Sequence, residues 1–172
     1  CCFFYSNKIY AYNCYAASNA GTVAPDNGTE CANKYIVPNT SGGGATKLKN
    51  ATHSGSDAYI TYQGEKYWFG EASGQKNIFT GQVENFNRVF YNKNNFNADI
   101  GYWNMSSAVV TSEMFKGARI FNQDIGDWDL SSNKWFWGMF YSARNFNQDI
   151  SNWDTGNSRS FSTMFAYAAK FN

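Results

Sequence analysis

The chain has 172 residues and a formal net charge of +1, and aromatic residues make up 19% of it. A charge so close to zero leaves no electrostatic footprint for nucleic acid and implies no strongly acidic partner. Leu is scarce, so the core is expected to consist of Phe, Trp, Met and Ile. No apolar run is long enough to span a membrane, and no signal peptide is recognisable.

All four cysteines, Cys1, Cys2, Cys14 and Cys31, lie near the start of the chain. An even number confined to one short segment predicts two disulfides, and disulfides imply an oxidising compartment. A bond between neighbouring cysteines is strained, so we expect Cys1 and Cys2 to pair with Cys14 and Cys31 in either order. A zinc site is the alternative, although the spacing lacks a C-x2-C element and His53 is the single histidine. A lipidated Cys1 also stays open.

Residues 1–72 are predicted to form a small, disulfide-containing, β-rich N-terminal domain. Residues 58–69 alternate between apolar and polar side chains around Gln63 and Gly64, which predicts a β-hairpin. Residues 35–37 are a candidate third strand. His53 lies in a Thr-His-Ser-Gly-Ser loop and is expected to be solvated. The domain would cover the first repeat; an assembly module such as the globular part of a pilin-like subunit is a weaker alternative.

Four N-x-[ST] sequons begin at Asn27, Asn39, Asn50 and Asn104. They are candidate glycosylation sites, and they matter only if the chain is secreted by a host that performs N-glycosylation.

Residues 73–172 form the second predicted domain, and from about residue 78 they repeat with a period of 25 residues. Equivalent positions, 25 residues apart, align without a gap, and each set of equivalent positions is called a column. A fixed period of this size predicts one supersecondary unit per repeat, stacked on its neighbours. A column of Asn residues from Asn97 to Asn172 is expected to form a side-chain ladder that satisfies the backbone of the turns. The predicted repeat core consists of Phe90, Phe96, Trp103, Phe115, Phe121, Trp128, Phe140, Phe146, Trp153 and Phe165.

Each repeat contains a segment with the spacing of a helix. Phe136, Met139, Phe140 and Ala143 are related as i, i+3, i+4 and i+7, which predicts one apolar helix face. The run that follows, Phe-Asn-x-Asp-Ile-x-x-Trp over residues 146–153, predicts a short strand or turn. One repeat is therefore interpreted as a short helix followed by a short strand.

The motif Met-Phe-x-x-Ala-x-x-Phe-Asn-Gln-Asp-Ile-x-x-Trp-Asp occurs at residues 114–129 and again at residues 139–154. It resembles the repeat of the BspA-like leucine-rich-repeat surface proteins, also known as the mycoplasma-type surface-protein repeat of unknown function. The resemblance covers about residues 78–172. It implies a cell-surface or secreted protein of a microbe or its virus, associated with adhesion or with host and matrix binding, and without known catalytic activity.

With this resemblance the predicted fold class is α+β: a right-handed, leucine-rich-repeat-like solenoid of about three and a half helix/short-strand repeats behind the N-terminal domain. The sequence departs from the family at one position of the repeat. Five residues after the Trp the family usually has Val, whereas this chain has Ala108, Asn133 and Ser158. The sequence also stops inside a repeat, and a solenoid needs a polar cap. We therefore expect the natural protein, or an assembly partner, to continue beyond Asn172.

Three aromatic residues of the third repeat are interface candidates. Trp135, Trp137 and Tyr141 occupy columns that hold mostly small or polar residues in the other repeats, which indicates exposure. Trp137 and Tyr141 would be i, i+4 neighbours on the predicted helix. An interface, including one for self-association, is the leading interpretation. Packing against a neighbouring helix or the N-terminal domain and glycan binding are the alternatives.

Asp99, Asp124 and Asp149 form a column of weak calcium candidates. Turn capping, in which each carboxylate accepts a backbone N–H, is the favoured interpretation. The sequence has no visible catalytic constellation, phosphate loop or dinucleotide fingerprint. We therefore expect no enzyme, no cofactor and no resident metal.

These patterns together predict an extracellular or cell-surface, non-catalytic structural or interaction protein. The leading expectation is a subunit of a surface assembly or filament that binds protein partners, above all copies of itself. An adhesin that binds host, matrix or glycan partners through the face of the repeats is the alternative, and a secreted enzyme is a remote one. No nucleic-acid partner and no transmembrane segment are expected.

Overall fold

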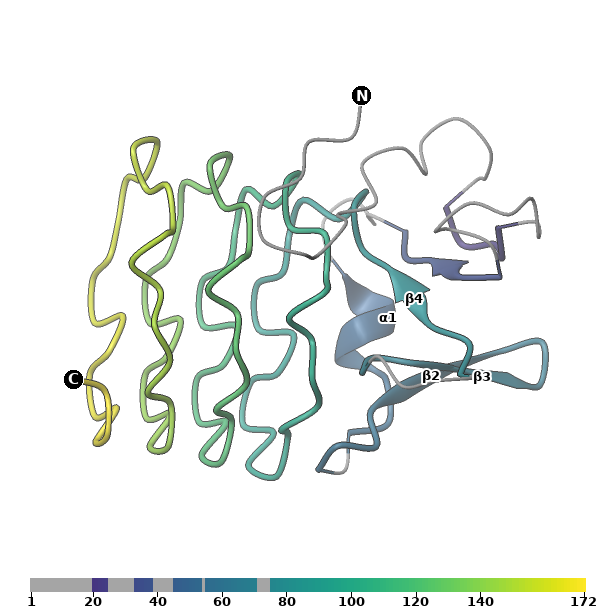
Figure 1. Ribbon diagram of the computed structural model, residues 1–172, viewed down its shortest axis with the longest axis horizontal. Helices are drawn as coiled ribbons and strands as arrows, with labels where there is room; N and C mark the ends of the chain where they lie inside the picture. Colours follow the sequence, from purple (N-terminus) through teal and green to yellow (C-terminus); the bar gives the residue numbers. More distant parts are fainter. Residues whose placement is uncertain (1–19, 25–32, 39–44, 54, 71–74) are drawn as a thin grey trace.

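The computed structural model describes residues 20–24, 33–38, 45–53, 55–70 and 75–172. Its elements, in chain order, are β1 (Tyr35–Ile36), α1 (Thr46–Lys49), β2 (Tyr59–Tyr62), β3 (Glu65–Trp68) and β4 (Ile78–Phe79). They lie at one end of an elongated molecule, and the repeats extend from them to the C-terminus (Figure 1). The four cysteines and their predicted disulfides lie outside the described residues.

The predicted hairpin is present. Strands β2 and β3 pair antiparallel, with Tyr59 opposite Trp68 and Tyr62 opposite Glu65. Gln63 and Gly64 join them with φ angles of 49° and 83°, as expected for the tight turn whose twist matches that of the two strands. The candidate third strand also forms, but β1 pairs in parallel with β4, not with the hairpin.

The predicted fold class is wrong. The only helix among the described residues is the four-residue α1, and residues 80–172 contain no helix and no strand longer than a single bridge. The leucine-rich-repeat-like solenoid of helix/short-strand units is therefore not what this sequence forms. The repeats consist of irregular, turn-rich chain, and the two small sheets lie before or at their start.

Left-handed backbone positions explain why the helical spacing does not produce a helix. Within residues 130–154 the N–H of Tyr141 donates to the carbonyl of Gly138, and the N–H of Ala143 donates to that of Phe140, which closes successive turns. The φ angles of Gly138 and Ser142 are +61° and +58°. A right-handed helix excludes such angles, so the apolar side chains reach the core from a succession of turns.

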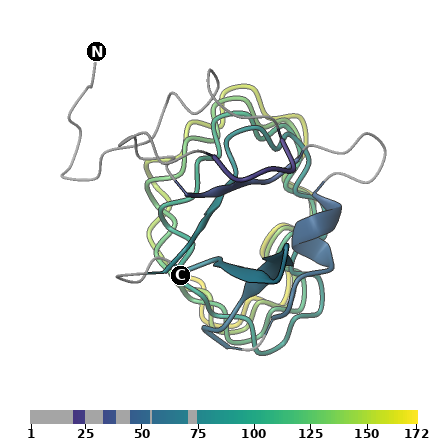
Figure 2. The ribbon, with the colours of Figure 1, turned by 90° about the vertical axis from the view of Figure 1, so that its right-hand side faces the viewer.

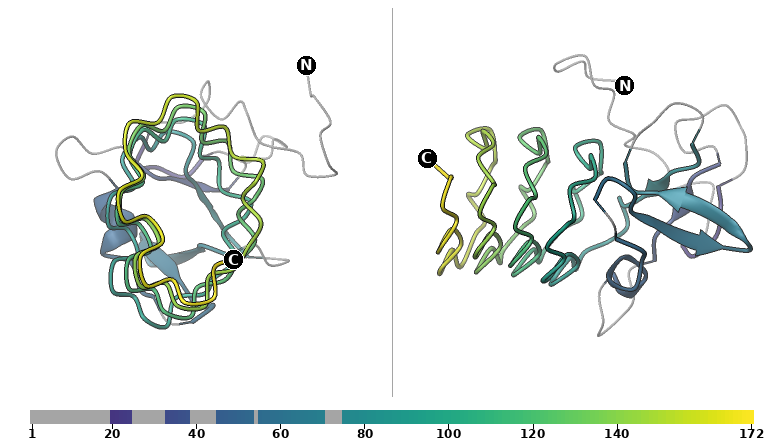
Figure 3. Two further views of the ribbon diagram at one scale, coloured as in Figure 1. Left: turned by 90° about the vertical axis from the view of Figure 1, so that its left-hand side faces the viewer. Right: turned by 90° about the horizontal axis from the view of Figure 1, so that it is seen from below.

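The four repeats, residues 80–104, 105–129, 130–154 and 155–172, lie side by side. Viewed along the long axis of the molecule, their traces nearly superpose (Figure 2 and Figure 3). Main-chain hydrogen bonds join neighbouring repeats. Along one segment of each repeat, every second residue donates its N–H to a carbonyl of the next repeat. For repeat 2 the bonds measure 2.8–3.0 Å and run from Thr111, Glu113, Phe115 and Gly117 to Trp135, Trp137, Met139 and Tyr141, respectively.

A double column of phenylalanine rings fills the interior. The ring centroids of Phe90, Phe115, Phe140 and Phe165 follow one another at 5.3, 5.4 and 5.5 Å. A second Phe column lies beside the first, with 3.8–4.0 Å between the two rings of one repeat. Nine of the ten predicted core residues are at most 8% exposed, and Phe165 is half-buried against the same core. Each such ring contributes a few kcal/mol of burial free energy.

The tryptophan column fixes the register between repeats. The indole N–H of Trp128 donates to the carbonyl of Ile100 at 3.1 Å, and Trp153 repeats the bond one step on. Trp103 makes the same bond to Phe69, which follows β3. The N-terminal region thus continues the packing of the repeats, and one hydrophobic cluster runs across both. The predicted domain boundary, between residues 72 and 73, falls among residues that the structure does not describe.

The asparagine column forms a ladder on the outside of the turns. The side-chain oxygen of Asn97 accepts the N–H of Asn122 at 2.9 Å, Asn122 accepts that of Asn147 at 2.8 Å, and Asn147 accepts that of Asn172 at 3.1 Å. Each amide oxygen thereby satisfies a backbone donor that the turn leaves free.

Replacing Gly126 by Ala is expected to lower the free energy of unfolding by about 1–3 kcal/mol. The new Cβ would lie 2.6 Å from the backbone oxygen of Asp149, so repeats 2 and 3 would have to separate. Chemical denaturation measures the effect. Ser151→Ala is the matched control, because Ser151 occupies the same column, already has a Cβ and is exposed; its effect should stay within about 0.5 kcal/mol. Equal stabilities for Gly126→Ala and the wild type would contradict this packing.

Candidate functional site

The two tryptophans predicted to face outward do so. Trp135 and Trp137 are each 38% exposed, and they belong to repeat 3, which has a repeat on either side. The guanidinium of Arg159 lies 6.0 Å from the ring centroid of Trp135. Exposed indoles are costly to hydrate and are typical of contact surfaces.

Tyr141 does not join the two tryptophans in one cluster. The helix that would have placed it beside Trp137 is absent, and no ring contact connects the two. Tyr141 is half-buried, and its ring lies between the ammonium of Lys116, at 4.9 Å, and the ring of Tyr167, at 5.1 Å. The predicted interface therefore divides into a tryptophan pair and a tyrosine next to basic residues.

A buried carboxylate, that of Glu113, forms ion pairs with two of the basic residues on this surface. The side chain of Glu113 is 1% exposed and forms ion pairs of 2.5 Å with Arg88, one repeat earlier, and with Lys116. Burial raises the pKa of Glu113, but the hydrogen bonds from Lys116 and Arg88 outweigh it, and the pKa lies below its ordinary value. Gly138 makes room for this side chain, because a Cβ there would lie 3.3 Å from Cγ of Glu113.

Lys116 is held between two tyrosines of neighbouring repeats. Its ammonium lies 5.7 Å from the ring of Tyr91 and 4.9 Å from that of Tyr141, which are favourable cation–π distances. The hydrogen bond to Glu113 raises the pKa of Lys116. The column Tyr91, Lys116 and Tyr141 is thus a ridge of two rings and one cation that is paired with Glu113.

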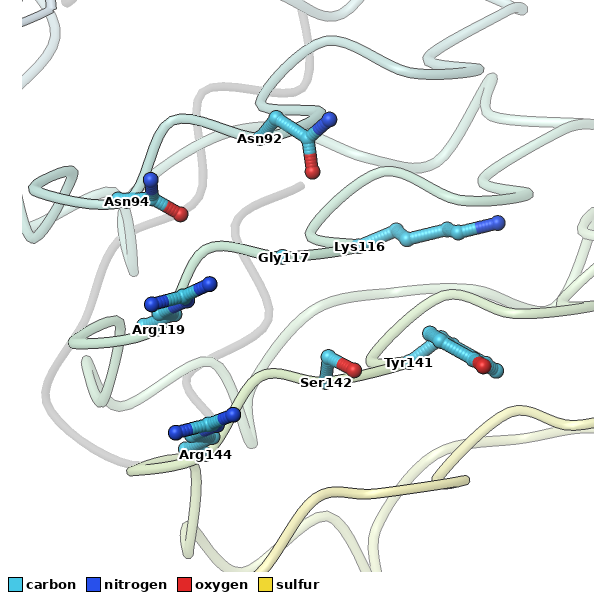
Figure 4. Close-up of a pocket in the computed structure, with 8 residues that line it drawn as sticks. All are labelled: Asn92, Asn94, Lys116, Gly117, Arg119, Tyr141, Ser142 and Arg144. Carbon is cyan, nitrogen blue, oxygen red and sulfur yellow. The ribbon is translucent and has the colours of Figure 1, made fainter.

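A pocket opens beside this ridge. The guanidinium groups of Arg119 and Arg144 stand one above the other on successive repeats, and the side chains of Lys116 and Tyr141 extend to the opposite side (Figure 4). Neither arginine side chain forms an ion pair or hydrogen bond with a described residue. No carboxylate stands among the described residues that line the pocket, which are Asn92, Asn94, Lys116, Gly117, Arg119, Tyr141, Ser142 and Arg144.

Sequence reasoning missed this pocket. Taken singly, Arg119 and Arg144 resemble ordinary solvated surface residues. The available signal was their 25-residue spacing, which places them in one column, together with the absence of an acidic residue at the neighbouring positions of the repeat.

The weak calcium candidates cap turns. Each is exposed, and each accepts a backbone N–H from the residue two positions later; the pairs are Asp99 with Gly101 at 3.1 Å, Asp124 with Gly126 at 3.1 Å and Asp149 with Ser151 at 2.9 Å. The bonds from Ser151 lower the pKa of Asp149. Within the described parts of the chain no three His, Cys, Asp or Glu residues gather as a metal site.

Two of the four sequons can be placed. Asn50 is exposed directly after α1. The side-chain oxygen of Asn104 accepts the N–H and the hydroxyl of Ser106 at 3.1 and 2.7 Å, so it takes part in a turn. Asn27 and Asn39 lie outside the described residues.

His53 is not the solvated loop residue that the sequence indicates. Its ring meets the rings of Phe69, Phe90 and Phe96 edge to face at 5.4–5.8 Å. Both ring nitrogens are buried without a hydrogen-bond partner among the described residues. Burial, and secondarily the charge of Lys93, lowers the pKa of His53 to about 4. The imidazole therefore belongs to the core and stays neutral at physiological pH.

These features define a turn-rich repeat protein with an aromatic and basic surface. The chain belongs to the family described as "Mycoplasma protein of unknown function, DUF285", whose family model matches residues 65–172. The resemblance to the mycoplasma-type repeat is thereby confirmed, whereas the likeness to BspA-like leucine-rich-repeat proteins stays a prediction. No curated protein and no solved structure matches the chain. None of the described helices is of a length and hydropathy that would cross a bilayer.

Stability is expected to fall as the pH drops from 6.5 towards 4. In this window the unfolded chain binds a proton on His53 and the folded chain does not, so the unfolded state gains stability. We expect a loss of about 1–2 kcal/mol, allowing for the solvent that reaches a half-buried ring. Urea titrations at several pH values measure it. His53→Leu should remove this component, while carboxylates such as Glu113 titrate alike in both proteins; parallel pH profiles would contradict the prediction.

Proposed function

We propose that this chain is an extracellular, non-catalytic interaction protein, and in the first place a structural subunit of a cell-surface assembly. The exposure of Trp135 and Trp137 carries the proposal. Both side chains project from a repeat that is covered on each side, so their exposure does not come from missing neighbours within the stack. Trp is among the residues that dominate the energetics of protein interfaces.

The even charge balance supports self-association. With 14 basic and 13 acidic residues, two copies of the chain meet without strong net repulsion. The rigid stacking of the repeats supports it as well, because a preorganised surface loses little conformational entropy when it binds.

An extracellular location is part of the same proposal. The surface is rich in Asn, Ser and Thr and poor in charge, and the matched family model is a mycoplasma one. The resemblance to BspA-like surface proteins, which the repeat motif at residues 114–129 and 139–154 carries, points in the same direction.

An adhesin is the second candidate function. The specific observation that favours it is the pocket with Arg119 and Arg144, whose two guanidinium groups have no anionic partner among the described residues. Surface arginines free of ion pairs suit recognition of a foreign anionic ligand.

Trp137→Ser is expected to weaken self-association about 30-fold, which corresponds to the loss of one interface hot spot of about 2 kcal/mol. Ser already occupies this column at Ser112 and Ser162, so the fold should tolerate it. Light scattering over a dilution series, with electron microscopy of the same samples, measures the effect.

Ile120→Ser is the matched control, since Ile120 is exposed to 40% in another column and its loss should leave assembly unchanged. A wild-type protein that is monomeric at all concentrations would overturn the structural-subunit proposal. Assemblies that survive Trp137→Ser intact would show that they form through another surface.

A further inference from the structure

We propose that the pocket at Arg119 and Arg144 binds the carboxylate or sulfate groups of an acidic polysaccharide. The assignment rests on the second of the two proposed functions, the adhesin, and is independent of self-association through the tryptophans. It is carried by two guanidinium groups that stand in one column without a described partner, and by the absence of any carboxylate from the described residues that line the pocket.

The charges around the pocket favour an anion. Lys116 lines it as well, and it shares the single carboxylate of Glu113 with Arg88. Arg119 and Arg144 form no ion pair with a described residue, so the described lining of the pocket is positive. A guanidinium presents a planar fork of donors that matches a carboxylate or sulfate oxygen pair, and such charge-assisted bonds are stronger than neutral ones.

The neutral side chains around the pocket favour a sugar. Asn92, Asn94 and Ser142 offer amide and hydroxyl groups, which can both donate and accept hydrogen bonds with sugar hydroxyls.

The extent of the charge argues against a nucleic acid. A nucleic-acid strand carries one phosphate per nucleotide and is held by a long basic track, whereas here two arginines without an ion pair to a described residue stand on two neighbouring repeats. The chain as a whole has a net charge of +1. A polymer with one anionic group per sugar or disaccharide, separated by hydroxyl-rich surface, fits this arrangement better.

The test measures binding of fluorescently labelled heparin and hyaluronan, which carry sulfate and carboxylate groups, by fluorescence anisotropy. Neutral dextran, single-stranded DNA and phosphatidylserine vesicles are the comparison probes. The variant is Arg119→Gln with Arg144→Gln, and the matched control is Lys47→Gln with Lys134→Gln. Both double variants lose two positive charges, and the control residues lie outside the pocket.

We expect the wild type and the Lys47/Lys134 control to bind at least one acidic polysaccharide, and the Arg119/Arg144 variant to bind at least about tenfold more weakly. Binding should weaken as the salt concentration rises. The slope of the logarithm of the binding constant against the logarithm of the salt concentration should correspond to roughly two released counterions. Circular dichroism and thermal unfolding establish that both variants are folded.

Several results would overturn the assignment: no binding of either acidic polysaccharide, equal binding of dextran, equal weakening in both double variants, or binding of DNA or vesicles as tight as that of the polysaccharides. Trp137→Ser, which leaves the pocket intact, is measured in parallel. If it dissociates assemblies but still binds polysaccharide, the two proposed functions are separated; if polysaccharide binding fails while assembly persists, the pocket assignment alone is wrong.

Discussion

The main-chain hydrogen bonds between repeats are the interaction on which the rest of the structure depends. Alternate residues of one repeat, such as Glu113 and Phe115, donate their N–H to the carbonyls of Trp137 and Met139, while the residues between them close turns within their own repeat. This division of donors satisfies the backbone without a helix or an extended strand. It requires the constant 25-residue period, because one inserted residue would shift every donor past its acceptor.

The same hydrogen bonding arranges the surface in columns. Residues 25 positions apart stand beside one another, so like side chains stack inside and equivalent side chains stand in columns outside. Arg119 and Arg144 share one column, and Tyr91, Lys116 and Tyr141 share another. A ligand that spans two repeats therefore meets two equivalent groups on a rigid support, which reduces the entropy that binding costs.

The sequence alone was sufficient to predict the 25-residue period, the columns that point into the core, the hairpin and the asparagine ladder, because each of them depends on the spacing of residues. It was insufficient to predict the backbone conformation within each repeat, because apolar residues at i, i+3, i+4 and i+7 are compatible with both a helix and a succession of turns. Gly117 and Gly138, both at positive φ inside the predicted helices, were the signal against a helix. The exposure of Trp135 and Trp137 followed from comparing repeats, whereas the burial of His53 depends on contacts between distant residues that no local pattern reveals.

Nuclear magnetic resonance of the labelled protein, through hydrogen exchange and nuclear Overhauser contacts of repeat 2, measures whether main-chain hydrogen bonds join the repeats. We expect the amides of Thr111, Glu113, Phe115 and Gly117 to be protected as a group and to lie close to the backbone of residues 135–141, and we expect contact between the Phe115 and Phe140 rings. A far-ultraviolet spectrum with little helix should accompany them. Sequential helical contacts over residues 111–118, without contacts between repeats, would contradict the account.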